Sequence, residues 1–340
     1  MIVDLRSDTV TRPTLGMLEA MFKARAGDDV YGEDETVNEL ERKASVMFNM
    51  EAAVFCPSGT MTNQIAINCL TAPMDEVITD QTAHVYRYEA GGMAFNSGVS
   101  VRLLEGDRGR ITAEQIEENL NPDDIHHPRS SLVVLENTVN RGGGSYYRVK
   151  DIEPVYHLCR LKNLKLHLDG ARLFNALVET GDSPKDYGRM FDSISICLSK
   201  GLGAPVGSLL LGSREMIQEA RRLRKVFGGG WRQAGYLAAA GIYALDHHIE
   251  RLKEDHQHAR ILENALNELP YTAAVLPVDT NILIFELDER FTPQAFIERL
   301  NHYNVKCNTF GRRLIRMVTH LDITPEMIDY TIEALKKIKG

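Results

Sequence analysis

Short apolar runs alternate with amphipathic stretches along most of the chain. The runs at 131–136, 165–169 and 192–198 have the length and apolar content of buried strands. Stretches with helical spacing separate such runs, for example at 151–162. Strands that alternate with helices between residues 50 and 215 predict a mostly parallel sheet covered by helices, which is an α/β fold.

The pattern changes towards the end of the chain. A helical period extends over 233–269, and near Asp246 the alternation of strands and helices stops. Two further strands and two helices are predicted at 281–286, 314–318, 293–303 and 325–339. We therefore expect a large α/β domain over residues 1–245 and a small C-terminal α+β domain over 246–340, with the boundary inside the long helix.

Composition excludes several classes of protein. A chain of 340 residues with 44% hydrophobic and 25% charged residues is typical of a globular protein. A net charge of -8 without a basic block argues against nucleic-acid binding, and no apolar run approaches the length of a membrane span. The 5 cysteines lack paired spacing, and the N-terminus lacks an apolar leader, so we expect reduced thiols in the cytoplasm. Histidines at 247, 248, 256 and 258 fit no zinc motif, so we expect most of them to be solvated and predict no metal site.

One lysine follows directly after a predicted buried strand. The strand at 192–198 leads to Lys200 and then to a loop that contains Gly201, Gly203 and Gly207. An amine at the edge of an apolar wall is partly desolvated, and glycines allow a ligand to approach closely. The position suits Schiff-base chemistry with an aldehyde cofactor, pyridoxal phosphate (PLP). The alternative is a surface lysine at the end of a strand.

A second informative stretch opens a predicted helix. Ser58, Gly59 and Thr60 follow a short apolar strand, so they offer unpaired backbone N–H groups, two hydroxyls and the positive end of the helix dipole. This arrangement predicts a phosphate site. The alternative is an ordinary capped helix.

Two further polar residues end predicted strands. His84 follows the strand at 77–79 and can stack on an aromatic ring or move protons, although a lone histidine can also be structural. Asp169 ends the strand at 165–169, where a carboxylate needs a cationic partner. That partner is a pyridinium nitrogen or, in the simpler alternative, Arg172. Because the ends of parallel strands meet at one crevice, these residues and Lys200 together predict a PLP site.

Eight stretches together carry a family resemblance. They include Leu-Asp-Gly-Ala-Arg at 168–172 and Ser-Lys-Gly-Leu-Gly at 199–203. The others lie at 4–13, 27–34, 57–60, 83–92, 228–233 and 316–320. The chain resembles the low-specificity L-threonine aldolases, which are PLP-dependent enzymes with the aspartate-aminotransferase-like fold. The resemblance implies retro-aldol cleavage of L-threonine, L-allo-threonine and other β-hydroxy-α-amino acids to glycine and an aldehyde.

The resemblance also implies roles for single residues around the cofactor. Lys200 would hold PLP, Asp169 would pair with the pyridine nitrogen, and His84 would stack on the ring and act as a catalytic residue. The expected phosphate and cofactor contacts come from Ser58, Gly59, Thr60, Arg172, Lys225 and Arg232, the last two from a neighbouring subunit.

The same resemblance implies which residues bind the substrate and how the subunits assemble. Ser7, Arg172 and Arg316 would bind the substrate carboxylate, which arginine can hold through two parallel hydrogen bonds. The family implies a homotetramer with sites at subunit interfaces, where Tyr31 would reach across to the substrate. A cation site near Thr9 and Thr11 stays an open alternative.

One departure from the family pattern concerns the loop after residue 136. The family commonly has Glu-Asn-Thr-His-Asn, and this chain has Val139 in place of the histidine. The change puts the preference between the two threonine diastereomers in doubt and leaves His84, or a water beside it, to take the hydroxyl proton. Two other functions stay open: β-elimination or racemisation on the same cofactor, and a PLP-binding module without turnover.

Overall fold

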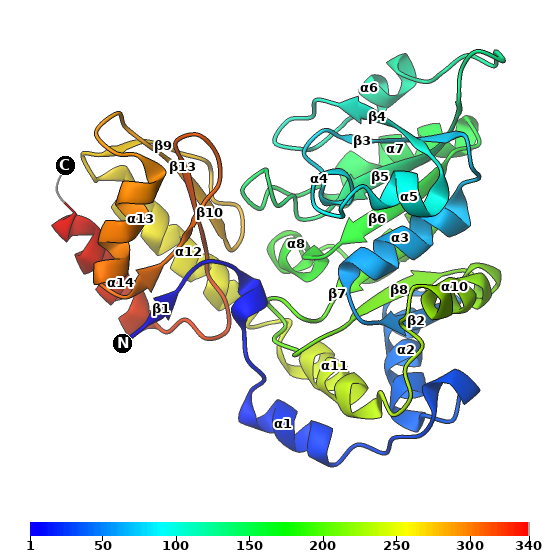
Figure 1. Ribbon diagram of the computed structural model, residues 1–340, viewed down its shortest axis with the longest axis horizontal. Coiled ribbons are helices and arrows are strands. Elements are labelled where there is room, and N and C mark those ends of the chain that lie inside the picture. Colours follow the sequence, from blue (N-terminus) through cyan, green and yellow to red (C-terminus); the bar gives the residue numbers. More distant parts are fainter. Residues whose placement is uncertain (339–340) are drawn as a thin grey trace.

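The computed structural model describes residues 1–338, which form a larger and a smaller lobe (Figure 1). The strands of the larger lobe are β2 (Ala52–Cys56), β3 (Asp75–Asp80), β4 (Ser100–Leu104), β5 (Arg129–Glu136), β6 (Lys165–Gly170), β7 (Ser193–Cys197) and β8 (Ser208–Gly212). Within the described residues they form a seven-stranded sheet in the order β2-β8-β7-β6-β5-β3-β4. Strands β3 to β7 pair in parallel, and β8 is antiparallel to both neighbours. The predicted mostly parallel sheet is confirmed.

Helices cover both faces of this sheet. They are α1 (Leu15–Phe22), α2 (Glu35–Phe48), α3 (Gly59–Leu70), α4 (His84–Arg87), α5 (Gly92–Ser97), α6 (Ala113–Glu118), α7 (Val149–Leu161), α8 (Leu173–Thr180), α9 (Pro184–Met190), α10 (Arg214–Val226) and α11 (Gly235–His247). Alternate residues of a strand point to opposite faces. Val54 and Cys56 of β2 therefore pack with α3 and α10, whereas Ala53 and Phe55 belong to the core that α2, α7 and α11 share.

The smaller lobe contains an antiparallel sheet and three helices. Its sheet consists of β9 (Thr272–Val275), β10 (Ile282–Leu287), β12 (Asn308–Thr309) and β13 (Leu314–Val318), and its helices are α12 (Leu252–Asn267), α13 (Pro293–His302) and α14 (Pro325–Lys337). Lys339, the predicted last residue of α14, lies outside the described residues. Within residues 1–338 no helix combines the length and the apolar character that a membrane crossing requires.

The N-terminal segment joins the two lobes. Strand β1 (Val3–Asp4) pairs in parallel with β11 (Val305–Lys306), and the amide of Val318 donates to the carbonyl of Leu5 at 2.8 Å. The chain then crosses to the larger lobe, where α1 packs against α11 (Figure 1). The division at residue 245 stays a prediction. Val3 to Leu5, which the prediction assigns to the large domain, form backbone hydrogen bonds with the smaller lobe.

The prediction of one long helix over 233–269 is wrong. The segment contains two helices, α11 and α12, because i→i−3 hydrogen bonds at Leu252, Lys253 and Glu254 replace the helical pattern between them. No glycine or proline marks the break, so tertiary contacts decide it. One such contact is the hydrogen bond between the His248 ring and the carbonyl of Leu202, at 2.7 Å.

The expectation that most histidines of this segment are solvated is also wrong. His248, His256 and His258 are buried, and His247 is exposed. The ring of His256 hydrogen-bonds Glu179 at 2.5 Å and Asn175 at 2.9 Å, and burial lowers its pKa. His256 therefore connects α12 to α8 of the larger lobe.

Candidate active site

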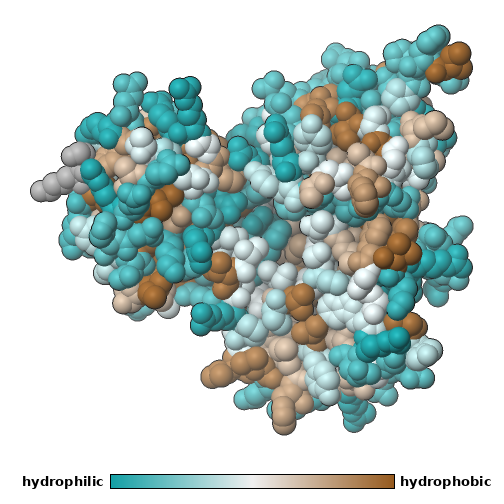
Figure 2. Space-filling view, viewed as in Figure 1, coloured by the Kyte–Doolittle hydropathy of each residue, from teal (hydrophilic) through white to brown (hydrophobic). Residues whose placement is uncertain are grey.

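A polar hollow lies between the lobes, where the strands of the large sheet end (Figure 2). It is a cavity of 680 Å³ lined by Ser7, Thr9, His84, Tyr88, Asn140, Arg141, Arg172, Lys200, Asn308, Thr309, Phe310, Gly311 and Arg316. The lining residues come from the loops after β3, β5, β6 and β7, from the N-terminal segment and from the smaller lobe. The lining contains one lysine and three arginines but no aspartate or glutamate, so the cavity suits anionic ligands.

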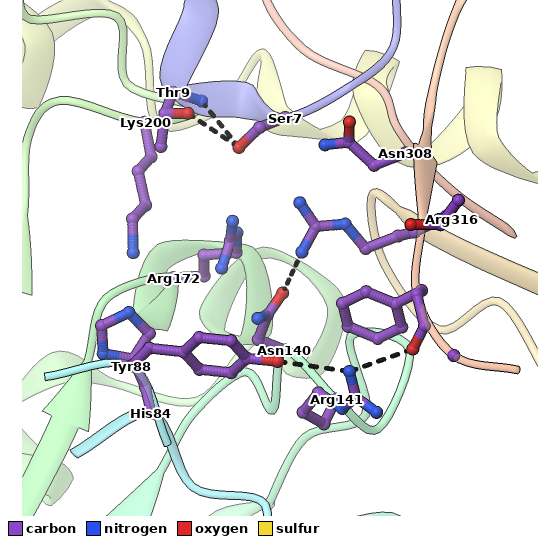
Figure 3. Close-up of a pocket in the computed structure, with 13 residues that line it drawn as sticks. Ser7, Thr9, His84, Tyr88, Asn140, Arg141, Arg172, Lys200, Asn308 and Arg316 are labelled. Carbon is purple, nitrogen blue, oxygen red and sulfur yellow. Dashed lines mark hydrogen bonds between the residues drawn. The ribbon is translucent and has the colours of Figure 1, made fainter. Parts of the chain in front are cut away.

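Lys200 points into this cavity (Figure 3). All residues of β7 are buried, and the chain leaves the strand through a turn in which the amide of Gly203 donates to the carbonyl of Lys200 at 2.8 Å. Gly203 has a φ of 77°, a conformation that favours glycine. The hydroxyl of Thr11 donates to the same carbonyl at 3.1 Å. Within residues 1–338 the ε-amine has no carboxylate within ion-pair distance, so it remains available to a ligand.

Asp169 lies at the end of β6 and is 2% exposed. The side-chain amide of Asn63 donates to it at 3.0 Å, and the ring of His167 contacts the oxygen of that amide at 3.1 Å. Arg172 does not pair with Asp169, so the simpler alternative of a salt bridge between them is wrong. A buried carboxylate without a cationic partner among the described residues fits a site for a cationic ligand group.

His84 begins α4 and lies beside Asp169. Its Nδ1 hydrogen-bonds Glu89 at 2.9 Å, and ligand atoms of His84, Glu89 and Asp169 lie within 4.8 Å of one another. Burial alone would lower the pKa of His84, but the hydrogen bond to Glu89 and the charge of Asp169 raise it. The imidazole is therefore held in one orientation and can exchange a proton within the cavity.

Arg172 has a different partner. Its Nε and Nη2 both donate to the carboxylate of Asp8, each at 2.7 Å, and both side chains are buried. Burial opposes ionisation of Asp8, but the charge of Arg172 outweighs it and holds the pKa of Asp8 well below its usual range. Arg172 still lines the cavity, although most of its charge is already matched.

Arg316 reaches the cavity from β13 without an acidic partner. Its Nη1 donates to the side-chain oxygen of Asn140 at 2.8 Å, and its Nη2 donates to the carbonyl of Arg6 at 3.1 Å. The Nε is buried without a hydrogen bond, and the guanidinium lies 4.9 Å from the ring centroid of Phe310. Burial, reinforced by the charge of Arg172, lowers the pKa of Arg316 to about 10. It remains protonated at neutral pH, and a carboxylate would match its charge.

The predicted phosphate residues Ser58, Gly59 and Thr60 lie at the start of α3, beside the end of β7, and do not line the cavity. The hydroxyl of Ser58 accepts from the amide of Met61 at 3.2 Å, as an ordinary helix cap would. A Cβ on Gly59 would meet Cys197 Sγ at 2.6 Å, so only glycine allows α3 to begin this close to the end of β7. Thr60 is exposed, which leaves the amides of this helix start accessible to an anion.

Asp169 and the three residues predicted to act from a neighbouring subunit also do not line this cavity. Tyr31 is 75% exposed, Lys225 is exposed on α10, and Arg232 donates to Asp28 at 2.9 Å. Their predicted roles in a neighbouring subunit stay predictions. Val139 is buried against Gly109 and does not line the cavity, so the position of the family histidine faces the protein interior here.

Sequence reasoning missed several residues of the site. Tyr88, Asn140, Arg141, Asn308 and Phe310 line the cavity. Asn140 and Arg141 follow Val139 in the loop after residue 136, and nothing local in the sequence indicates which of these side chains turn inward. Tyr88 and Phe310 come together through Arg141, whose Nη1 donates to the hydroxyl of one and the carbonyl of the other.

The buried side chain of Glu136 hydrogen-bonds two loops that line the cavity. One oxygen accepts from the amide of His84 and the other from the amide of Asn140, each at 2.9 Å. Burial, together with the charge of Asp169, raises the pKa of Glu136 to about 7. A carboxyl group whose pKa is higher in the folded than in the unfolded state stabilises the fold most at low pH, and this contribution is lost as pH rises through about 7.

Glu136→Gln should therefore change how stability depends on pH. In the protein without cofactor, the unfolding free energy of the wild type minus that of the variant should fall by roughly 3 kcal/mol between about pH 5 and 8, since one pKa unit corresponds to about 1.4 kcal/mol. Denaturant titrations at several pH values measure it, with the exposed Glu118→Gln as the control. A difference that stays constant with pH would contradict the raised pKa.

The chain is similar to known proteins over most of its length. A family model described as beta-eliminating lyase matches residues 4–290. The low specificity L-threonine aldolase of Escherichia coli (strain K12) is 43% identical over 328 residues, covering 96% of both chains. A probable low-specificity L-threonine aldolase 2 of Arabidopsis thaliana is 40% identical over 344 residues, covering 99% of this chain and 97% of its own.

Solved structures show the same fold. A threonine aldolase from Leishmania major superposes with a TM-score of 0.86 at 23% identity, covering 98% of this chain and 99% of its own. An Escherichia coli protein with a methionine aminotransferase function superposes with a TM-score of 0.77 at 14% identity, covering 99% and 93%. The predicted aminotransferase-like fold is confirmed. The chain belongs to the beta-eliminating lyase family, together with the low-specificity L-threonine aldolases that it resembles in sequence.

Proposed function

We propose that the protein is a PLP-dependent lyase that cleaves L-threonine, L-allo-threonine and related β-hydroxy-α-amino acids to glycine and an aldehyde. One observation carries the proposal. A half-buried guanidinium without an acidic partner, that of Arg316, faces the same cavity as the ε-amine of Lys200, and no acidic residue lines this cavity. An amino acid that reacts at its α-carbon needs both groups, one for its carboxylate and one for the chemistry at its amine.

The described residues fit PLP, the cofactor on which this family generally depends. Lys200 would attach its aldehyde, Asp169 would pair with its ring nitrogen, and the helix start at Gly59 and Thr60 would bind its phosphate. The bound cofactor supplies a sink for the electrons left on the α-carbon when the Cα–Cβ bond breaks. The buried carboxylate of Asp169, which accepts hydrogen bonds from Asn63 and Ala171 but forms no salt bridge within residues 1–338, supports this assignment.

The residues around the cavity would orient the substrate and move one proton. Arg316, held by Asn140, would bind the α-carboxylate, and the hydroxyl of Ser7 lies on the same wall. A fixed carboxylate restrains rotation about the neighbouring bonds and so selects which bond at the α-carbon breaks. The His84–Glu89 pair would accept the proton of the β-hydroxyl group.

β-Elimination is the second candidate function, because the matching family model carries that description. It uses the same lysine, the same aspartate and the same carboxylate site, so the cavity alone favours neither reaction. The products distinguish them. Retro-aldol cleavage gives glycine and acetaldehyde from threonine, and β-elimination gives pyruvate and ammonia from serine.

The assay uses the purified protein with added PLP. We expect acetaldehyde and an equal amount of glycine from L-threonine and from L-allo-threonine, and little pyruvate from L-serine. A coupled alcohol dehydrogenase follows acetaldehyde, and amino-acid analysis follows glycine. Pyruvate from serine without glycine from threonine would replace the aldolase proposal by the lyase alternative, and the absence of all these products would reject both.

We also propose a homotetramer of the cytoplasm. The exposed positions of Tyr31, Lys225 and Arg232 suit contacts with a neighbouring subunit, and the five cysteines are free thiols, as in a reducing compartment. Light scattering measures the mass in solution. A monomer with full activity would remove the proposed contribution of these three residues to a neighbouring site.

A further inference from the structure

The cavity contains more positive charge than the proposed reaction uses. Of its four basic side chains, Arg172 is matched by Asp8, Lys200 is assigned to the cofactor, and Arg316 to the substrate α-carboxylate. Arg141 is left. None of the residues that line the cavity is acidic, so nothing in its wall neutralises this fourth charge.

Arg141 is fixed in place by neutral groups. Its Nη1 donates to the hydroxyl of Tyr88 at 3.2 Å and to the carbonyl of Phe310 at 3.0 Å, and its guanidinium carbon lies 4.2 Å from the centroid of the Phe310 ring. In Figure 3 a dashed line joins the Arg141 guanidinium to the Tyr88 hydroxyl. Within residues 1–338 no carboxylate forms an ion pair with it. A positioned, half-buried and unmatched guanidinium is suited to bind an anion.

Arg141 and Arg316 pack against the same Phe310 ring, at 4.2 and 4.9 Å from its centroid, but their hydrogen-bond partners differ. Arg316 is held by Asn140 and Arg6, whereas Arg141 is held on the side of Tyr88, whose ring centroid lies 5.6 Å from that of His84. His84 is the group proposed to act at the β-hydroxyl. Its hydrogen bond to Tyr88 links Arg141 to the side of the cavity where His84 would act, and the substituent on the β-carbon would enter there.

We propose that Arg141 binds an anionic group at the end of the substrate's β-substituent. The substrate class is that of β-hydroxy-α-amino acids whose side chain ends in a carboxylate, of which L-threo-β-hydroxyaspartate is the shortest. In its cleavage the Cα–Cβ bond breaks, the β-hydroxyl loses its proton, the α-carbon gains one, and the products are glycine and glyoxylate. The inference rests on the proposed aldolase function and extends its substrate range.

The test compares two substrates in three forms of the holoenzyme. The wild type should cleave both β-hydroxyaspartate and threonine. Arg141→Gln should lower kcat/KM for β-hydroxyaspartate by about 10- to 100-fold, the scale of one hydrogen bond to a charged group, and change that for threonine by no more than about twofold. Arg312→Gln removes an exposed arginine that does not line this cavity and should change neither value.

The outcomes separate this inference from the aldolase proposal. If the wild type cleaves threonine but not β-hydroxyaspartate, or if Arg141→Gln affects both substrates equally, Arg141 does not recognise a side-chain anion. If Arg141→Gln does not fold, Arg141→Lys is the second variant. Because it keeps the charge, it should retain part of the preference for β-hydroxyaspartate over threonine. If Arg141→Lys instead loses activity on threonine and keeps it on β-hydroxyaspartate, the inference is overturned. If the wild type yields no glycine from any substrate, the aldolase function itself fails.

Discussion

Replacing Lys200 by alanine should reduce threonine cleavage by about 10⁴-fold or more, the scale on which removal of an essential nucleophile lowers turnover. The side chain points into the cavity, and within the described residues no carboxylate holds its amine. The variant should also lack the visible absorbance of covalently attached PLP. Steady-state acetaldehyde release and an absorbance spectrum after dialysis against PLP measure the two effects.

Two controls make the result for Lys200 specific. Lys185→Ala removes an exposed lysine of α9 and should leave activity and spectrum unchanged. Circular dichroism should show that Lys200→Ala keeps its helical content, because the backbone of Lys200, and not its amine, bonds Thr11 and Gly203. Full activity of Lys200→Ala would show that another group attaches the cofactor or that none does.

Arg316→Gln should lower kcat/KM for threonine by about 10²-fold, since hydrogen bonds to a charged group contribute about 1.5–3 kcal/mol each. The loss should appear mainly in KM if Arg316 binds the α-carboxylate equally in the ground and transition states, and in kcat if it orients the bond that breaks. Glutamine can still donate to Asn140, so the neighbouring loop keeps a hydrogen-bonding partner. Kinetics with threonine over a wide concentration range measure both constants.

Arg313→Gln is the matched control for Arg316. Arg313 precedes β13, pairs with Glu286 and does not line the cavity, so its replacement should leave kcat/KM within about twofold, as is usual away from a site. Arg316→Lys should recover part of the loss because it keeps the charge without the two parallel hydrogen bonds. If Arg316→Gln binds threonine as the wild type does, the α-carboxylate has another partner.

The sheet and the positions of its strand ends could be predicted from the sequence. Buried strands have apolar runs, and helices between them impose a parallel order, so Asp169, His84 and Lys200 had to lie near one another. Asp8 was different. Its pairing with Arg172 joins residues far apart in the sequence, and no periodicity shows which of two carboxylates a given arginine meets.

The break between α11 and α12 illustrates a second limit. The sequence from 233 to 269 keeps a helical period, and the break follows from contacts such as that of His248 with Leu202. Side chains on loops show the same limit. Val139 turns inward, whereas Asn140 and Arg141 reach the cavity, and only the folded loop decides between these orientations.

The attachment of PLP to Lys200 can be tested directly by reducing the holoenzyme with borohydride, digesting it and locating the modified peptide by mass spectrometry. We expect a single pyridoxyl phosphate group on the lysine that follows Ser199, and none on any other lysine. A label on a different lysine, or no label in protein that cleaves threonine, would contradict the assignment of this cavity as the active site.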